Sequence, residues 1–434
     1  MKLYNSYSEK IEDINLDEFN IYNCGPTVYN HIHIGNARPL IIFDVLHRFL
    51  LATGKKVNFL HNLTDIDDKI INEAIKQGKK ELEISSYYAK QYQIIREKLN
   101  TLPLHIEKVS DHINGIIDYV QAMITKGIAY HVNGNVYFDT SKVSVYGHLS
   151  NRKLDDQLIG ERVALTDEKK NETDFVLWKK TNIGIQWETP WGLGRPGWHS
   201  ECSYLIEKHF NNNLTIHGGG IDLKFPHHEN ENAQHYGLHN CGLSKIWMHI
   251  GHININNEKM SKSLNNFIYV KDILETYSYQ VVRWFMYKTN YQNPLNFNNN
   301  IMEICNNEIH KLNNNINYLK TILINAHAYE LNEKILDEEF ISYLANNLNI
   351  TNAIVTIQKI LKDANQLIRN KQYETTNIKL NQIVNCLKIL GIEFTNIHND
   401  ENIKLIKQYY EAIATKNYKE SDKLREILIS KGLI

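Results

Sequence analysis

One segment sets the architecture of this chain, and it reads Cys24-Gly25-Pro26-Thr27-Val28-Tyr29-Asn30-His31-Ile32-His33-Ile34-Gly35-Asn36. Residues 19–23 before it alternate apolar and polar side chains, which predicts a strand, and the Gly-Pro pair then breaks the chain. Residues 40–51 after it are apolar at helical spacing, and Gly54 suits a helix C-terminus. The segment therefore puts a thiol at a strand end and a His-rich loop at a helix N-terminus, which favours bound phosphate. Together these features suggest a nucleotide site beside a metal or thiol site.

The composition is that of an ordinary soluble protein with two to four domains. The chain has 434 residues, of which 42% are hydrophobic and 22% charged. No apolar run reaches the roughly 18 residues of a membrane span, and residues 1–5 lack the apolar core of a signal peptide. The five cysteines are scattered and odd in number, which argues against a disulfide framework. We expect the protein in the cytoplasm and away from membranes.

Charge gives only a local hint of a nucleic-acid partner. The formal net charge is −1, so the chain has no global basic footprint for nucleic acid. Between residues 359 and 388, six basic residues outnumber two acidic ones. Taken alone, such a stretch is better explained as a solvated helix surface than as a phosphate-binding face.

The order of the expected elements predicts an α/β domain that carries an insertion. The strand at 57–61 and a helix from Thr64 to about Gly78 continue the strand and helix above, as in a parallel sheet covered by helices. Residues 130–138 hold Asn-Gly between two alternating runs, which predicts a hairpin. We therefore interpret residues 115–195 as an insertion, of which 150–172 are polar and irregular.

The sheet is expected to resume near residue 198 and to be followed by helices. The next expected elements are a helix at 199–210, a strand at 214–217, a helix opened by Pro226, a strand at 245–250, a polar loop at 256–266 and a helix at about 272–288. Beyond residue 298 the apolar period is helical, which predicts a bundle over 299–390 and a last pair of short helices at 402–434.

Four side chains form a candidate metal site. His227 and Glu231 stand four residues apart, so on a helix they share one face. Cys24 and Cys202 would complete a sulfur, sulfur, nitrogen and oxygen set suited to zinc. No short-range CxxC spacing supports these two cysteines. From spacing alone, buried apolar cysteines and a coincidental His-Glu pair are the simpler interpretation.

Other motifs have simple alternatives as well. The lysines of Lys259-Met260-Ser261-Lys262-Ser263 can neutralise a triphosphate, although an exposed basic turn is common. Trp198 before a helix and His217 at a strand end are more often core or structural residues. Gly218-Gly219-Gly220 allows a ligand to approach the backbone or simply turns the chain. The stretch Thr64-Asp65-Ile66-Asp67-Asp68 can bind a cation, but an acidic capping turn is the simpler explanation.

Taken together, the motifs resemble the class I aminoacyl-tRNA synthetases, and within them the cysteinyl-tRNA synthetase family. Seven motifs in the family's order are far more specific than any one of them, and they cover about the first 300 residues. They are residues 22–29 (YNCGPTVY), 33–36 (HIGN), 62–69 (NLTDIDDK), 194–199 (GRPGWH), 216–220 (IHGGG), 225–231 (FPHHENE) and 259–263 (KMSKS).

The resemblance implies a Rossmann-like parallel-sheet catalytic domain with an insertion, followed by an all-helical C-terminal region. It also implies a set of site residues. One Zn²⁺ would be held by Cys24, Cys202, His227 and Glu231. The catalytic residues at the ATP phosphates would be His33, Asn36, Lys259 and Lys262. Gly35 and Asp222 would complete the ATP site, and Mg²⁺ would accompany ATP. The cysteine side chain would be bound by Thr64, Trp198 and His217.

The implied partners are tRNA(Cys), ATP and L-cysteine, with a monomer as the expected state. The implied division is a catalytic domain at 1–114 and 196–250, an inserted connective subdomain at 115–195, a KMSKS-loop and stem-contact region at 251–298, a bundle at 299–390 and a small anticodon-recognition region at 391–434. Two features depart from the family pattern. Asn36 stands where the family has histidine, and residues 391–434 are shorter than its usual anticodon domain.

Two competing functions are consistent with the same motifs. An ATP-dependent ligase with this catalytic core could join cysteine to an amino sugar and would need no anticodon-binding region. A non-catalytic RNA-binding protein could have kept a degenerate synthetase fold. The intact Cys24, His33 and Lys262 argue against such decay, and the helical extension after residue 299 favours tRNA.

Overall fold

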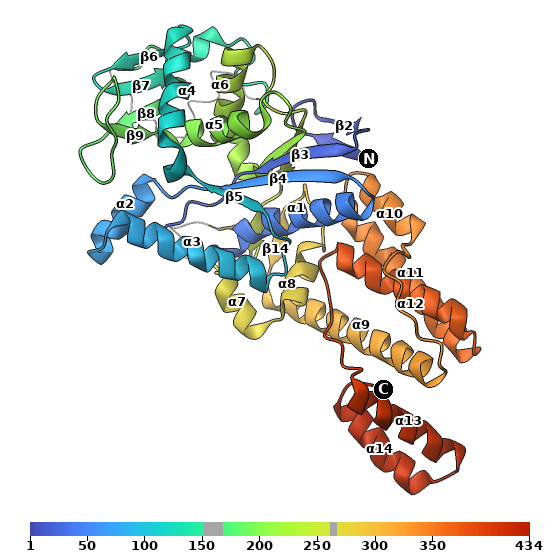
Figure 1. The fold of residues 1–434 in the computed structure, drawn as a ribbon. Coiled ribbons are helices and arrows are strands. Elements are labelled where there is room, and N and C mark those ends of the chain that lie inside the picture. Colours follow the sequence, from blue (N-terminus) through green and yellow to red (C-terminus); the bar gives the residue numbers. More distant parts are fainter. Residues whose placement is uncertain (152–167, 261–266) are drawn as a thin grey trace.

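The computed structural model describes residues 1–151, 168–260 and 267–434, and its centre is a five-stranded parallel sheet (Figure 1). The strand order is β11-β10-β3-β4-β5, and every neighbouring pair runs parallel. The chain changes direction across the sheet on either side of β3, as in doubly wound folds. The predicted Rossmann-like parallel sheet is confirmed. Its strands are β3 (Glu18–Asn23), β4 (Lys56–Leu63), β5 (His105–Lys108), β10 (Ile216–Gly220) and β11 (Ile246–Ile250).

Helix α1 (Ile34–Ala52) connects β3 to β4 and packs against the sheet. Apolar side chains on most of its circumference are buried, among them Ile41 and Phe43. It begins at Ile34, so the predicted apolar run extends back to the His-Ile-Gly element. Gly54 follows its end with φ of +77°, a left-handed conformation that favours glycine. Helices α2 (Asp68–Gln77) and α3 (Glu81–Lys98) follow β4.

A second, antiparallel sheet occupies the region between β5 and β10. Its strand order is β6-β7-β8-β9, and it packs with helix α4 (Ile113–Thr125) around a separate apolar core. The predicted hairpin is confirmed, because Asn133 and Gly134 both adopt positive φ between β6 and β7. The strands are β6 (Ala129–Val132), β7 (Asn135–Phe138), β8 (Phe175–Lys180) and β9 (Gly194–Pro196). Most of the irregular stretch at 150–172 lies outside the described residues.

The chain returns to the central sheet through α5 (Trp198–Phe210). The prediction that Pro226 opens the next helix is confirmed, because helical backbone angles follow Phe225 without a further break and lead into α6 (Glu229–His239). Phe225 has extended φ and ψ of −139° and 134°. The residue before a proline is sterically disfavoured in the helical region, so the chain is kinked at Phe225, within the turns η4 (Ile221–Leu223) and η5 (Lys224–His228) that precede α6.

The expected single helix at 272–288 is two helices, α7 (Val270–Thr276) and α8 (Tyr279–Met286). Tyr277 and Ser278 between them are extended, with ψ of 143° and 158°. Aromatic residues lose rotamer freedom in helices and serine favours caps, which explains the break. Strands before and after these two helices form a small sheet with the order β13-β12-β14. Its strands are β12 (Ile253–Ile255), β13 (Glu258–Lys259) and β14 (Leu295–Phe297).

The C-terminal region is helical, as predicted. Figure 1 shows α13 and α14 at the end of the molecule opposite the antiparallel sheet. The helices are α9 (Asn299–Asn325), α10 (Glu338–Ala345), α11 (Ile350–Arg369), α12 (Tyr373–Ile389), α13 (Asp400–Ala414) and α14 (Tyr418–Ser430). The N-terminal hairpin β1 (Lys2–Asn5) and β2 (Lys10–Asp13) was not predicted. None of the described helices is long and apolar enough to cross a membrane.

Three asparagines spaced by four on α12 clamp the connection between α9 and α10. Asn381 Nδ2 donates to the carbonyl of Glu330, and its Oδ1 accepts from the backbone N–H of Asn332. Asn377 and Asn385, on the same face, also bond to this connection. These amides substitute for the backbone partners that an irregular segment lacks.

We expect Asn381→Ala to lower the free energy of unfolding by about 1–3 kcal/mol, because a buried N–H loses its partner. Asn381 is 2% exposed, whereas Asn377 is more exposed, so Asn377→Ala should cost less. Urea unfolding followed by circular dichroism compares the two variants. Equal losses would mean that the clamp has no special energetic role.

Candidate functional site

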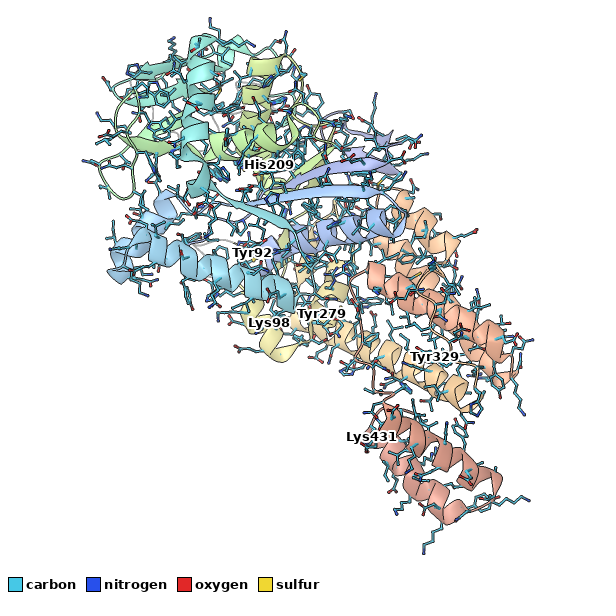
Figure 2. All side chains as sticks on the ribbon, in the orientation of Figure 1. Tyr92, Lys98, His209, Tyr279, Tyr329 and Lys431 are labelled. Atoms are coloured by element: carbon cyan, nitrogen blue, oxygen red, sulfur yellow. The ribbon has the colours of Figure 1, made fainter. Side chains whose placement is uncertain are left out.

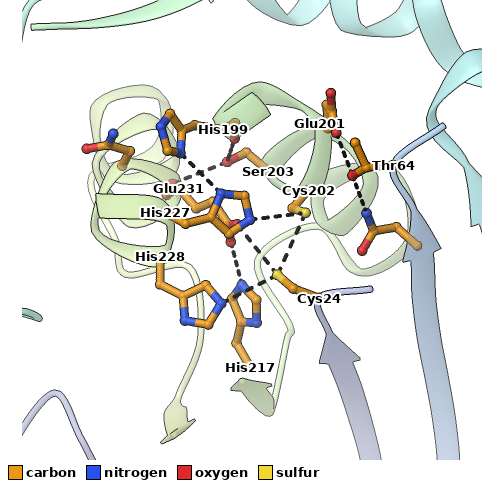
Figure 3. A network of polar contacts seen from close by, with 12 residues as sticks. Cys24, Thr64, His199, Glu201, Cys202, Ser203, His217, His227, His228 and Glu231 are labelled. Carbon is orange, nitrogen blue, oxygen red and sulfur yellow. Dashed lines mark hydrogen bonds and ion pairs between the residues drawn. The ribbon is translucent and has the colours of Figure 1, made fainter. Parts of the chain in front are cut away.

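The four predicted metal ligands come together at the carboxyl ends of the central strands (Figure 3). Cys24 directly follows β3, and its N–H donates to the carbonyl of Gly218 in the adjacent strand β10. Cys202 lies in α5, which packs beside α6. His227 lies in η5, directly before α6, and Glu231 lies in the first turn of that helix. Parallel strands end at one edge of the sheet, and this edge gathers side chains that are distant in sequence.

The ligand atoms are in contact with one another. Cys24 Sγ lies 3.7 Å from Cys202 Sγ and 3.7 Å from Glu231 Oε1. Cys202 Sγ lies 3.6 Å from His227 Nε2. His227 Nε2 lies 2.7 Å from Glu231 Oε1. Both cysteines are free thiols, and their separation is far beyond a disulfide bond.

The protonation of the cluster favours a bound cation. Burial would lower the pKa of His227, but the charges of Glu231 and Cys202 and the hydrogen bonds to them together outweigh burial and raise that pKa to about 10. Burial would raise the pKa of Cys202, yet hydrogen bonds with Cys24 and His227 lower it to about 6. A thiolate and a carboxylate therefore face a single imidazolium in a buried place. A metal ion can replace that proton and satisfy all of these groups.

The cluster opens, at Cys24, into a cavity of about 360 Å³ that six of the thirteen predicted site residues line. Trp198 is 36% exposed, and its ring stacks on His227 with centroids 4.1 Å apart. The predicted residues on the cavity wall are Cys24, His33, Gly35, Asn36, Trp198 and Asp222. One cavity therefore connects the thiol cluster to the start of α1.

Thr64 and His217, predicted for the cysteine pocket, are held behind this wall. The Thr64 hydroxyl donates to Glu201 at 2.9 Å, and both side chains are buried. His217 Nε2 lies 2.5 Å from Glu231 Oε2, and its ring is fully buried. Both residues support the cluster from behind, and their contact with a substrate remains a prediction.

The other end of the cavity is the N-terminus of α1. His33 is the N-cap residue, and Asn36 Oδ1 accepts its backbone N–H at 3.2 Å. The substitution of asparagine for histidine therefore gives the helix a capping partner, while the amide nitrogen of Asn36 can still donate to a phosphate. Burial lowers the pKa of His33 to about 4, so its imidazole is neutral at physiological pH.

The predicted KMSKS motif is described only in part. Lys262 and the side chain of Lys259 lie outside the described residues. Met260 and Phe267, on either side of residues 261–266, both line the cavity. The Phe267 ring lies 5.2 Å from that of His33, and the N–H of Ile34 donates to the carbonyl of Ile268. The described residues on either side of 261–266 therefore lie beside the His-Ile-Gly element.

Comparison with known proteins agrees with this architecture. The model of the class I (C) tRNA synthetase catalytic domain matches residues 10–307. The cysteine–tRNA ligase of Ureaplasma parvum serovar 3 is 50% identical over 436 residues, with all of both chains covered. The chain belongs to the cysteine–tRNA ligase family. The cysteine–tRNA ligase of Malacoplasma penetrans is 46% identical to this chain, again over the whole length of both chains.

The fold of this cysteine–tRNA ligase family member also resembles a solved synthetase structure. The Mycobacterium tuberculosis methionyl-tRNA synthetase in complex with methionyl-adenylate has a TM-score of 0.63, with 91% of each chain covered. The sequence identity is 14%, so this likeness concerns the fold alone.

Two histidines beside the thiol cluster were not predicted from the sequence to belong to the site. His228 Nε2 lies 3.4 Å from Cys24 Sγ, and His228 Nδ1 lies 2.8 Å from His249 Nε2. An overlapping set of possible metal ligands, within ligand distance of one another, consists of Cys24, His217, His228 and Glu231. His228 follows His227 directly, which could have indicated it. His249 lies in strand β11 with no pattern to single it out.

Buried neutral histidines should make this cysteine–tRNA ligase family member sensitive to acid. His61 lies between the carbonyl of Asn23 and the hydroxyl of Tyr92, at 2.8 and 2.7 Å, and burial lowers its pKa to about 3. Because the folded-state pKa lies below the unfolded value of about 6.5, this contribution is complete above pH 6.5 and is lost toward pH 3.

We expect the urea midpoint of the wild type to fall steeply as the pH falls below 6.5, since protonating His61 alone opposes folding by roughly 5 kcal/mol at the acidic limit. His61→Asn removes the titrating group and should be less stable at pH 7.5 but lose less stability on acidification. Urea titrations at pH 7.5 and pH 5 compare them. Parallel losses in both proteins would exclude His61 as a main source of acid sensitivity.

Proposed function

We propose that the protein activates L-cysteine with ATP and transfers it to tRNA(Cys), with a zinc ion that selects the substrate thiolate. The observation that carries the proposal is a single cavity. At one end it has Cys24 and the thiol cluster, and at the other the N-terminus of α1 with His33. An amino acid with a sulfur side chain and a nucleoside triphosphate can therefore meet in it.

The spacing of three of the four donor atoms matches zinc, and His227 Nε2 and Glu231 Oε1, now 2.7 Å apart, would separate to about 3.3 Å around the ion. Zn–S bonds of about 2.3 Å and Zn–N bonds of about 2.0–2.1 Å at tetrahedral angles put two sulfurs about 3.8 Å apart and sulfur about 3.5 Å from nitrogen. The corresponding distances among Cys24, Cys202 and His227 are 3.7 and 3.6 Å. Two thiolates, an imidazole and a carboxylate are soft and borderline donors, which suit zinc better than magnesium or calcium.

Selection between cysteine and serine is the main demand on such a site. Shape alone discriminates pairs that differ by one small group by roughly 10–200-fold. Zinc binds thiolate readily and a hydroxyl poorly, so a metal that accepts the substrate sulfur supplies the missing selectivity. Four protein ligands normally close a zinc site, so Glu231 must bind loosely or the coordination must expand. His217, which contacts the second oxygen of Glu231, is placed to hold that carboxylate when it moves.

Neither chemical step needs a nucleophile from the protein. The carboxylate of cysteine attacks the α-phosphate of ATP and pyrophosphate leaves, and the terminal ribose hydroxyl of the tRNA then attacks the adenylate carbonyl. The chain contributes positioning and charge stabilisation. The backbone N–H groups at the start of α1, the neutral His33 and the Asn36 amide donate to phosphate oxygens. Lys262, assisted by Lys259, neutralises the departing pyrophosphate, and Mg²⁺ accompanies ATP.

The helical region after residue 299 is the proposed tRNA surface, with the bundle along the stem and residues 391–434 at the anticodon. The basic stretch on α11 and α12 supports this less than its composition suggests. Lys359 and Lys388 lie 3.1 and 3.0 Å from Glu339 and Glu333. Part of its charge is therefore already paired on an exposed helix surface, as the simpler interpretation of the sequence holds.

The test combines two assays on the purified full-length protein. Cysteine-dependent ATP–pyrophosphate exchange measures activation, and charging of tRNA(Cys) measures transfer. We expect exchange with cysteine but not with serine, and formation of cysteinyl-tRNA. Exchange with transfer to an amino sugar but not to tRNA would support the ligase alternative. Binding of tRNA without exchange would support a non-catalytic RNA-binding protein.

A further inference from the structure

A second group of possible metal ligands lies at the far end of α5, apart from the thiol cluster. His105 and Glu107 lie two residues apart on β5, so their side chains leave the same face of the strand. His209, in the last turn of α5, faces them. Figure 2 labels His209 near the junction between the antiparallel sheet and the central strands. One ligand atom from each of the three residues lies within 4.8 Å of the other two.

The distances fit a single small cation. Glu107 Oε1 lies 3.1 Å from His105 Nε2 and 3.0 Å from His209 Nε2. Ligand bonds of about 2.0–2.2 Å at tetrahedral angles would put these atoms about 3.3 Å apart. The three side chains would therefore need to move apart only slightly to bind a metal ion. The side chain of His105 is 59% exposed, which leaves an entry path for the ion.

A relay of side chains fixes the orientation of the carboxylate. Lys208 Nζ donates to His112 Nδ1 at 3.1 Å, so the proton of the neutral His112 ring is on Nε2. His112 Nε2 in turn donates to Glu107 Oε2 at 2.5 Å. Oε1 is therefore the oxygen that faces His105 and His209. Partners of this kind typically orient the ligands of a metal.

His209 gives a second, independent indication. Its Nε2 is buried and, among the residues that the structure describes, has no hydrogen-bond partner, although Glu107 Oε1 lies 3.0 Å away. A buried nitrogen without a hydrogen-bond partner destabilises the folded state. A metal ion placed between this nitrogen and the carboxylate would satisfy both.

The location joins the two connections of the inserted region. His105 and Glu107 lie on the strand from which the chain leaves the central sheet, and His209 ends the helix by which it returns. The same helix, α5, carries Trp198 and Cys202 of the active-site cluster. An ion here would fasten the end of α5 to the edge of the sheet.

We propose that His105, Glu107 and His209 form a second metal site, which binds a divalent transition ion such as Zn²⁺ and links α5 to β5. Two imidazoles and one carboxylate suit zinc, nickel or copper better than magnesium or calcium. The site is separate from the thiol cluster, and the proposal does not depend on the proposed function.

The experiment measures metal content in the full-length protein. Wild type is dialysed against buffered, micromolar free Zn²⁺ and analysed by inductively coupled plasma mass spectrometry. We expect two zinc ions per chain in the wild type and one in the double variant His105→Asn/His209→Asn. The matched control is His131→Asn, an exposed histidine of the inserted hairpin, which should keep two. Equal zinc content in the wild type and the double variant overturns the proposal.

Two further readouts make the assignment specific. After exchange into Co²⁺, the thiolate-to-cobalt absorption of the cluster should be unchanged in the double variant, while the sulfur-free second site loses its weaker visible bands. The described residues contain another group of this kind, Glu207, His235 and His239. If the double variant still holds two ions and His239→Asn holds one, that group is the site and the proposal is wrong. Circular dichroism checks that each variant is folded, and the single variants replace the double one if it is not.

Discussion

Cys202→Ser is expected to abolish metal binding at the thiol cluster and to remove most of the discrimination between cysteine and serine. The thiolate of Cys202 contacts both Cys24 and His227, and a serine hydroxyl binds zinc poorly. Without the metal, the cavity can select by shape alone, so the ratio of kcat/KM for cysteine over serine should fall to roughly 10–200 or lower. ATP–pyrophosphate exchange with each amino acid measures the ratio.

The matched control is Cys241→Ser, the same chemical change at a half-buried cysteine just after α6. It should keep both metal content and selectivity. Metal analysis should show the Cys202 variant one equivalent below the control. Should the Cys202 variant lose its metal and still strongly prefer cysteine, selection by zinc would have to be abandoned in favour of a shape-selective pocket.

Lys262→Ala is expected to lower the rate of adenylate formation by roughly 10²–10³-fold, because one cation that stabilises transition-state charge is removed. Met260 and Phe267, on either side of residues 261–266, line the cavity beside His33. The metal content should not change, because the thiol cluster is built from other elements. Pre-steady-state or exchange measurements at saturating cysteine give the rate.

Lys419→Ala removes a charge from an exposed position on α14 and serves as the control for charge alone. It should leave exchange with ATP unchanged. A Lys262 variant that also lost zinc would indicate a folding defect, and one with normal exchange would show that the lysine has no part in activation.

The sequence was most informative where local chemistry and fold agree. The strand, Gly-Pro break and helix around Cys24 to Asn36 were predicted from alternation and helical period, and they occur as β3 and α1. The Asn-Gly hairpin was predicted equally well, because positive φ at Asn133 and Gly134 is a local requirement. The helical C-terminal region followed from its period alone.

The errors lie where a single residue or a tertiary contact overrides the pattern. The extended Tyr277 and Ser278 interrupt a run whose apolar spacing is continuous. Strand β5 is four residues long and reads as polar, since it lies at the sheet edge. Periodicity measures burial along one element and carries no information about short edge strands.

The sequence by itself determined the class of the fold and, through seven ordered motifs, the family. The chemistry of the centre depended on the tertiary structure, because Cys24 and Cys202 reach each other only when parallel strands end at a common edge and α5 returns beside them. The same holds for Thr64 and His217, which stand behind the cluster and bond to Glu201 and Glu231. Spacing along a chain fixes which side chains share a face of one element, whereas contacts between elements follow from the path of the whole chain.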